Sequence, residues 1–360
     1  MKRVAIALSG GIDSSVATAL LLEQGYNVFG LTMSAKLPRD YKNISSDDIF
    51  SQSIESAKKI VNILGIEHYI INIGKEFADI VIKYFLNEYN HGRTPNPCIV
   101  CNPEIKWGIL LRYAKKFGAN YFATGHYARI EKPQCTGIDK YKLLKARSHY
   151  QDQSYMLWRL NQEQLAKTIF PVGELTKDKV RHIAKKYHFP THEQVDSQEI
   201  CFAQDYSSFI KQAMPDIKKG PIFYHTGEKL GEHQGIQFYT IGQRKGINIP
   251  FSKPLYVYKI DCNSNAIYVT DKEDLLYHNA LICDDINLII GDSFFEMDDI
   301  NIKVRYRTLP ITGKICMLSG NRIEVEFITS IRAISPGQSA VFYKDDELIG
   351  GGIIIKSFDK

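Results

Sequence analysis

A glycine-rich junction, Ser9-Gly10-Gly11, separates an apolar stretch at 4–8 from a segment that predicts a helix starting at about Asp13. The glycines carry no side-chain bulk, so their backbone N–H groups can approach a phosphate, and the helix N-terminus adds partial positive charge. No lysine follows the glycines and the spacing is not G-x-G-x-x-G, which excludes a Walker A loop and a dinucleotide-binding turn. A Gly-Gly pair alone serves packing as readily as binding, but the full string Ser-Gly-Gly-Ile-Asp-Ser predicts a phosphate cradle.

Three cysteines are the second group of residues that could do chemistry. Cys98 and Cys101 form a C-x-x-C pair within 92–102, where prolines and asparagines predict a rigid loop instead of regular structure. By itself this pair could be half a zinc site, a redox couple or two unused thiols. No second C-x-x-C exists in the sequence, which disfavours a zinc site made of cysteines alone. Cys201 is isolated in a polar stretch, and a lone cysteine is more often a small buried hydrophobe than a nucleophile.

Alternating strands and helices in the first third of the chain must position these residues. Apolar stretches at 4–8, 27–32, 68–72 and 121–124 read as strands, with helical segments between them. This alternation predicts a parallel sheet with helices on both faces, an α/β fold in which ligands bind at the strand C-termini. Residues around Ser9, Met33 and Gly125-His126 follow strands at that edge, so we expect them to share one nucleotide site.

The residue pattern changes in the remainder of the chain. Glycine and proline become frequent from about 207, and short alternating strands separated by turns follow after about 277. The latter pattern predicts a small antiparallel β-barrel. We therefore expect three domains: a catalytic domain over 1–206, a central domain over 207–276 and a C-terminal barrel over 277–360.

The composition of the chain bears on its partners and its location in the cell. The chain has 360 residues, a formal net charge of +5 and seven cysteines. This mild positive charge permits a nucleic-acid partner without establishing one. Neither a signal peptide nor a long apolar run is evident, so we expect a cytoplasmic protein with reduced thiols and no membrane association.

These motifs together resemble a known family. The string from Ser9 to Ser14 resembles the PP-loop of the ATP pyrophosphatases, which cleave ATP to AMP and pyrophosphate. The whole set, spread over nearly the full chain, resembles the tRNA-specific 2-thiouridylases, which place sulfur on the wobble uridine. Besides the PP-loop, the matching segments are Thr94-Pro95-Asn96-Pro97, Cys101-Asn102, Ile105-Lys106, Thr124-Gly125-His126-Tyr127, Asp152-Gln153-Ser154-Tyr155, Asp196-Ser197, Ile200-Cys201-Phe202, 241–246, 304–307 and 335–338.

The resemblance implies a reaction. The carbon-2 oxygen of the uridine would attack the α-phosphate of ATP, with magnesium on the phosphates and Asp13 either helping to hold that metal or capping the helix. A persulfide on Cys201, loaded by a sulfur-relay protein or a cysteine desulfurase, would then attack the carbon, and AMP would leave. Cys101 would resolve the persulfide, which leaves a Cys101–Cys201 disulfide for an external reductant.

The resemblance also implies three sets of binding residues. ATP would contact Ala7, Leu8, Ser9, Gly10, Gly11, Ile12, Asp13, Ser14, Met33 and Gly125. The target base, splayed out of the anticodon loop, would contact Asn96, Pro97 and Cys98. The tRNA would contact His126, Gln151, Asp152, Gln153, Arg305, Tyr306 and Gln338.

Two positions depart from the family pattern. Cys98 stands where the family often carries an Asp with a proton-transfer or base-positioning role, which Cys98 could fill only as a thiolate. Alternatively, Cys98, Cys101 and Cys201 could hold an iron–sulfur cluster with one open iron site for sulfide. Gln151 stands where the family usually has Lys, so one phosphate contact should be weaker. Two other hypotheses are a PP-loop ligase or amidotransferase that adenylates a small molecule, and an RNA-binding or metal-binding module with an inactive ATP site.

Overall fold

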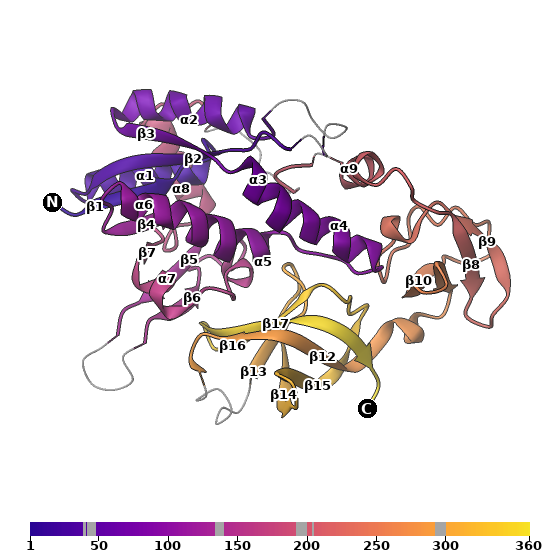
Figure 1. The fold of residues 1–360 in the computed structure, drawn as a ribbon. Helices are drawn as coiled ribbons and strands as arrows, with labels where there is room; N and C mark the ends of the chain where they lie inside the picture. Colours follow the sequence, from indigo (N-terminus) through magenta and orange to yellow (C-terminus); the bar gives the residue numbers. More distant parts are fainter. Residues whose placement is uncertain (39–40, 42–47, 134–139, 192–199, 204, 292–299) are drawn as a thin grey trace.

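The computed structural model describes residues 1–38, 41, 48–133, 140–191, 200–203, 205–291 and 300–360. Figure 1 shows an N-terminal α/β part, a small sheet at one side and a barrel that ends near the C-terminus. Within the described residues, no helix combines the length and the apolar character needed to cross a membrane.

A five-stranded parallel sheet forms the centre of the N-terminal part, which confirms the predicted α/β class. Its strand order is β3-β2-β1-β4-β7, with every neighbouring pair parallel. The bounds are β1 Arg3–Ala7, β2 Asn27–Ser34, β3 Glu67–Asn72, β4 Tyr121–Thr124 and β7 Thr168–Ile169. The chain order reverses between β2 and β4 across β1, and this switch point is where open α/β sheets bind ligands.

Helices cover both faces of this sheet because both faces of its central strand are apolar. Val4 and Ile6 pack into one buried cluster, whereas Ala5 packs into the other. The first face carries α1 (Ile12–Glu23), α2 (Ser51–Leu64) and α8 (Lys177–Lys186). The opposite face carries two longer helical runs. One comprises α3 (Gly74–Phe77), a π-helical segment Ala78–Ile82 and α4 (Lys83–Asn90), and the other comprises α5 (Cys98–Val100), a π-helical segment Cys101–Leu110 and α6 (Leu111–Lys116).

The segment that carries Cys98 and Cys101 is helical, so the rigid loop predicted over 92–102 is wrong in its second half. The helix begins at Cys98 directly after Pro97, a position where a proline costs no backbone hydrogen bond. Pro103 lies inside the π-helical segment, whose wider turn moves the preceding carbonyls away from the proline ring. Further along the chain, a single 3₁₀ turn forms at Ser154–Met156.

The C-terminal part is the predicted antiparallel barrel. Six strands follow the order β12-β15-β14-β13-β16-β17, and β12 pairs with β17 to close the ring. Their bounds are β12 Tyr277–Leu288, β13 Ile300–Lys303, β14 Ile311–Leu318, β15 Arg322–Arg332, β16 Ser339–Lys344 and β17 Glu347–Phe358. A hairpin of β5 (Ala128–Glu131) and β6 (Lys142–Lys145) extends this sheet from the N-terminal part, through pairing of β6 with the start of β17.

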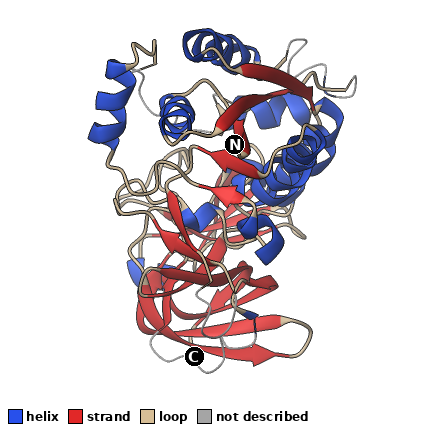
Figure 2. Cartoon of the chain, turned by 90° about the vertical axis from the view of Figure 1, so that its left-hand side faces the viewer, coloured by secondary structure: helices blue, strands red, loops and turns tan. Residues whose placement is uncertain are grey.

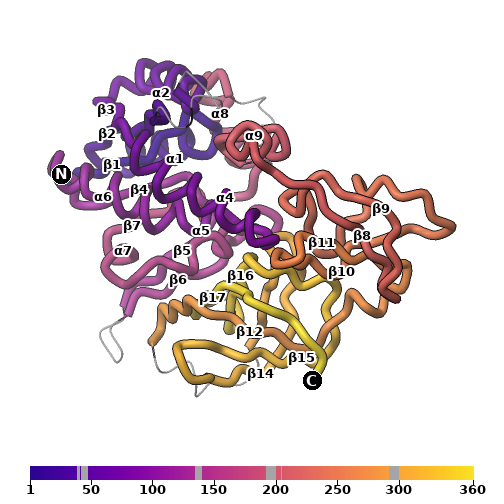
Figure 3. Tube along the Cα trace, turned by 45° about the vertical axis from the view of Figure 1, so that its right-hand side comes forward, coloured from indigo at the N-terminus to yellow at the C-terminus, as the bar shows by residue number. Residues whose placement is uncertain are grey.

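The region between these parts holds a separate four-stranded sheet of order β10-β11-β8-β9, which Figure 3 shows at the edge of the molecule beyond α9 (Tyr206–Ala213). The strands are β8 Gly220–Tyr224, β9 Lys229–His233, β10 Tyr256–Asp261 and β11 Ala266–Thr270. The remaining short helices are α7 Gln162–Ala166 and the 3₁₀ turns Ile236–Phe238 and Glu273–Leu276. In Figure 2, helices gather around the parallel sheet at one end and strands dominate the end that holds the C-terminus.

Candidate active site

The loop between β1 and α1 is shaped by hydrogen bonds before any ligand arrives. Gly11 is the N-cap of α1, and its carbonyl accepts hydrogen bonds from the Ser14 and Ser15 hydroxyls at 3.0 and 2.9 Å. The Ser9 and Ser14 hydroxyls lie 3.2 Å apart. Gly10 has a φ of 73°, and a Cβ atom there would lie 2.5 Å from the backbone nitrogen of Ala57, so this position requires glycine. The backbone thus forms the open turn at a helix N-terminus that the sequence predicted.

The ends of β1, β2 and β4 meet at this loop. A cavity of about 300 Å³ is lined by Ala7, Leu8, Ser9, Asp13, Ser14, Met33 and Gly125. The structure thus brings together seven of the residues expected to contact ATP, while Gly10, Gly11 and Ile12 form the turn between them. Gly125 lies so close to α1 that a Cβ atom would be 2.6 Å from the backbone nitrogen of Ser14. The cavity also includes Phe50 and Ser53, which our sequence reasoning did not identify.

Asp13 belongs to a partly buried ion pair that the sequence did not reveal. The Lys177 ammonium donates to both carboxylate oxygens, at 2.8 and 2.9 Å, and the Tyr127 hydroxyl donates to one of them at 2.6 Å. Lys177 is the first residue of α8 and is buried. The N-cap of α1 is Gly11, so Asp13 does not cap this helix with its side chain. Lys177 places a cation beside the glycine loop, which lacks a lysine of its own.

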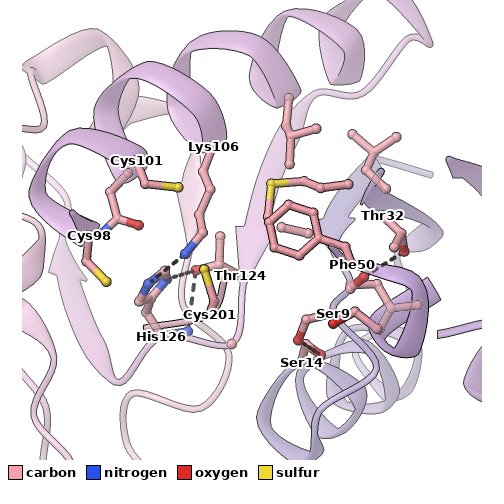
Figure 4. A pocket seen from close by; sticks show the side chains of 18 of the residues that line it. Ser9, Ser14, Thr32, Phe50, Cys98, Cys101, Lys106, Thr124, His126 and Cys201 are labelled. Atoms are coloured by element: carbon pink, nitrogen blue, oxygen red, sulfur yellow. Dashed lines mark hydrogen bonds between the residues drawn. The ribbon is translucent and has the colours of Figure 1, made fainter. Parts of the chain in front are cut away.

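The three thiols line the opposite end of the same cavity (Figure 4). Cys98 and Cys101 come from the start of the helical run that begins at Cys98, and Cys201 comes from the segment after α8. All three are free thiols; Cys98 and Cys201 are exposed, whereas Cys101 is buried. Residues 192–199, which include the predicted Asp196-Ser197 motif, lie outside the described residues. A phosphate cradle and three cysteines therefore share one cavity, although more than 80 residues separate each group in sequence.

The surroundings keep these thiols protonated at neutral pH. Burial raises the pKa of Cys98 and of Cys201, and it raises the pKa of Cys101 to about 11. Although Cys98 and Cys201 open onto the cavity, the protein mass around it reduces their hydration. The Lys106 ammonium acts in the opposite direction and lowers the pKa of all three thiols.

Lys106 is connected to His126, a residue expected to contact tRNA. The ammonium lies 3.4 Å from His126 Nε2, and His126 Nδ1 lies 2.8 Å from the Thr124 hydroxyl (Figure 4). Burial and then the Lys106 charge hold the pKa of His126 well below its usual range. The imidazole is therefore neutral, accepts from Lys106 and donates to Thr124. Lys106 is part of the Ile105-Lys106 motif, but its position among the thiols could not be read from the sequence.

Lys106→Met should make the thiols less reactive. Without the ammonium, the thiol pKa values rise and the thiolate fraction at neutral pH falls, so alkylation of Cys201 at pH 7 should slow about tenfold. The alkaline limb of its pH profile should move to higher pH. Site-resolved iodoacetamide labelling followed by peptide mass spectrometry measures both effects. Lys115→Met, at an exposed lysine on α6, is the control; equal rates in both variants would contradict the assignment.

The residues expected to surround the target base lie at the mouth of the thiol end. Pro97 and Cys98 line the cavity, and Asn96 precedes them. The Asn96 side chain accepts a hydrogen bond from the Cys98 backbone N–H at 3.1 Å and lies 3.0 Å from the Met156 sulfur. The barrel reaches this loop as well, because the Gln338 side chain donates to the Thr94 carbonyl at 2.8 Å. Gln338, expected to contact tRNA, is thus placed beside the base-pocket segment.

The other residues expected to contact tRNA differ in accessibility. His126 and Gln153 line the cavity. Arg305 donates to the Ser335 hydroxyl at 2.8 Å and to the Ala333 carbonyl, so its guanidinium holds a loop of the barrel. Tyr306 and Gln151 are partly exposed, at the barrel and at the turn before Asp152. Asp152 is buried, and its carboxylate accepts from the backbone N–H groups of Ala146 and Ser154 and from the Ser154 hydroxyl.

Asp152→Ala should destabilise the fold. The substitution leaves buried donors without an acceptor and weakens the contact of Ser154 with the Tyr343 hydroxyl of the barrel, 3.1 Å away. We expect a loss of about 3 kcal/mol in the free energy of unfolding, measured by urea denaturation. Asp346→Ala is the matched control, because that carboxylate is 49% exposed in its ion pair with Arg129, and its loss should cost less than about 1 kcal/mol. Equal losses in both variants would contradict the structural role of Asp152.

The placement of the three cysteines bears on the iron–sulfur hypothesis. Among the residues that the structure describes, no three His, Cys, Asp or Glu side chains lie together as a metal-binding group. Cys98, Cys101 and Cys201 are all described, so their placement gives the iron–sulfur hypothesis no support.

A parallel sheet of this order, with a Ser-Gly-Gly-Ile-Asp-Ser loop at its switch point, defines the N-terminal part as a PP-loop type of α/β domain. Known families match the same regions: residues 2–205 match the tRNA methyl transferase HUP domain, residues 207–271 the tRNA methyl transferase PRC-barrel domain and residues 278–354 the aminomethyltransferase beta-barrel domain.

Relatives that match over nearly the full length of the chain show which family it belongs to. The chain is 41% identical to the tRNA-specific 2-thiouridylase MnmA of Natranaerobius thermophilus, over 99% of this chain and 98% of that protein. It is 42% identical to the protein of the same name from Clostridioides difficile, over 99% of both chains, and 42% identical to that from Treponema denticola, over 98% and 97%. The chain belongs to the tRNA-specific 2-thiouridylase family.

Proposed function

We propose that this protein is a tRNA-uridine 2-sulfurtransferase that uses ATP to activate the wobble uridine and a cysteine persulfide to deliver sulfur. The observation that carries this proposal is the single cavity that holds both the glycine loop and the thiols of Cys101 and Cys201. Such a site can activate an oxygen at one end and replace it with sulfur at the other, without release of the activated base. The family of the chain supports the same reaction.

Activation is the first step. The carbon-2 oxygen of the uridine attacks the α-phosphate of ATP, and pyrophosphate leaves. The backbone N–H groups of Ser9-Gly10-Gly11 and the N-terminus of α1 hold the phosphates. Asp13 is the only carboxylate among the described residues that line the cavity, and it would be the protein ligand of a Mg²⁺ on the ATP phosphates, in competition with the Lys177 ammonium that both of its oxygens accept from. The Mg²⁺ ion would neutralise the charge on the departing pyrophosphate.

Sulfur transfer follows at the other end of the cavity. The terminal sulfur of a Cys201 persulfide attacks carbon 2 and forms the carbon–sulfur bond. The Cys101 thiolate then attacks Cys201 Sγ and breaks the S–S bond, so the transferred sulfur stays on the base while AMP leaves with the original oxygen. The enzyme is left with a Cys101–Cys201 disulfide. The Lys106 ammonium favours the thiolates on which both attacks depend.

The partners follow from this chemistry. The substrate is the anticodon stem-loop of a tRNA, and the sulfur donor is a sulfur-relay protein or a cysteine desulfurase. We place the reaction in the cytoplasm, where reducing conditions keep these cysteines as thiols. A small-molecule ligase would use the glycine loop but would leave the three thiols and the barrel contact at Thr94 without a role.

A coupled product assay tests the proposal. Purified protein is incubated with ATP, Mg²⁺, unmodified tRNA, a cysteine desulfurase with L-cysteine as the persulfide source and a thiol reductant, and nucleoside mass spectrometry is run beside an AMP assay. We expect 2-thiouridine and AMP to accumulate together. AMP formed equally without tRNA would favour a small-molecule ligase, and absence of ATP binding would favour a binding module.

A further inference from the structure

Cys98 is a third thiol for which the proposed transfer has no use. It is the first residue of the helical run, directly after the N-cap Pro97, and its backbone N–H is held by the Asn96 side chain at 3.1 Å. It is exposed, whereas Cys101 three residues later is only 7% exposed. An accessible cysteine at a helix N-terminus, paired with a buried one, is the arrangement that C-x-x-C redox pairs use.

The first helical turn brings Cys98 and Cys101 onto one side. The Cys101 N–H donates to the Pro97 carbonyl at 2.9 Å and also to the Cys98 carbonyl. Val100 N–H bonds the Pro97 carbonyl in the same i to i+3 pattern, at 3.2 Å. Residues three apart in a helical turn are neighbours on the helix surface. Cys98 and Cys101 are therefore neighbours along one edge, within the Cα separation that a disulfide accepts.

Cys101 shares its cavity with both other thiols. All three cysteines line the same cavity, with Cys201 contributed by a different segment (Figure 4). A negative charge on Cys101 raises the pKa of the Cys201 thiol more than a negative charge on Cys98 does.

We infer that Cys98 is a second resolving thiol, which takes over the disulfide left by sulfur transfer and frees Cys201 for reloading. This inference rests on the proposed function, because the Cys101–Cys201 disulfide is a product of that reaction. The Cys98 thiolate attacks Cys101 Sγ, the Cys98–Cys101 bond forms, and Cys201 leaves as a thiolate that takes up the proton lost by Cys98. No net oxidation occurs in this exchange. An external dithiol then attacks exposed Cys98 Sγ, Cys101 leaves, and the dithiol is oxidised as the pair is reduced.

Disulfide mapping on the full-length protein tests the inference without ATP or tRNA. Reduced protein is treated with one equivalent of diamide, equilibrated with a glutathione buffer, quenched in acid, alkylated and digested for mass spectrometry. We expect the Cys98–Cys101 linkage to exceed Cys101–Cys201 at least about tenfold, with Cys201 alkylated. Cys98→Ser should instead retain Cys101–Cys201, and Cys201→Ser should form Cys98–Cys101 directly.

Cys262→Ser, which removes an exposed cysteine that does not line the cavity, should behave as the unmodified protein. The inference is overturned if Cys98 is alkylated at every stage while Cys101–Cys201 persists, or if Cys201→Ser forms no Cys98–Cys101 linkage. Because the readout contains no substrate, this result is independent of the 2-thiouridine assay. Failure of the thiolation assay with a positive mapping result would instead count against the proposed function.

Discussion

Cys201→Ser should reduce 2-thiouridine formation by about a thousandfold or more, because a serine hydroxyl cannot carry a persulfide sulfur. Release of pyrophosphate in the presence of tRNA should continue, since the activation end of the cavity consists of the loop after β1 and the strand ends around it. The two halves of the reaction would thereby be separated. The measurement is nucleoside mass spectrometry beside a pyrophosphate assay on the same samples.

The matched control for this variant is Cys316→Ser, at an exposed cysteine on β14. That variant should thiolate at the normal rate. Because Cys201 is exposed and serine is nearly isosteric, Cys201→Ser should unfold at the same urea concentration as the unmodified protein. Normal thiolation by Cys201→Ser would show that another residue carries the sulfur.

Gly125→Ala should lower kcat/KM for ATP by about a hundredfold, through displacement of the phosphate loop. A Cβ atom at this position would lie 2.6 Å from the Ser14 nitrogen and 2.8 Å from the Asp13 carbonyl carbon. Both are backbone atoms of the first turn of α1, so the end of β4 and the start of α1 must move apart. The added methyl group therefore disturbs the geometry in which phosphates are held, and the effect should appear in steady-state kinetics of pyrophosphate release with varied ATP.

Gly118→Ala is the control for strain alone. Gly118 precedes β4, has a φ of 80°, and an added Cβ atom would find its nearest neighbour at 3.9 Å. This variant should lose about 1 kcal/mol of stability with its kinetics for ATP unchanged. If Gly125→Ala shows only the same loss of stability and normal kinetics, the close approach of β4 and α1 does not shape the ATP site.

The architecture could be predicted from the sequence because its signals are local. Apolar stretches of strand length alternate with helical segments, and this pattern specifies a parallel sheet with helices on both faces. The geometry of the Ser-Gly-Gly-Ile-Asp-Ser turn could be predicted from its own residues, because a turn between a strand and a helix depends on the residues within it. Thr176 likewise caps α8 as its type predicts, accepting from the Lys179 N–H. The short alternating strands after 277 specified the barrel.

The chemical environment of the site was decided by tertiary structure alone. Lys177 meets Asp13 across 164 residues of sequence, and no local pattern marks either residue as the partner of the other. Cys98 and Cys101 lie in a helix instead of a loop because packing of the run 98–116 outweighs the local preference of Pro103. Asp152 and Arg305, expected to contact tRNA, are engaged by backbone and hydroxyl groups of the fold. Residue types and spacing determine which elements form, whereas the partners, burial and pKa of each side chain depend on contacts between segments that only the folded chain brings together.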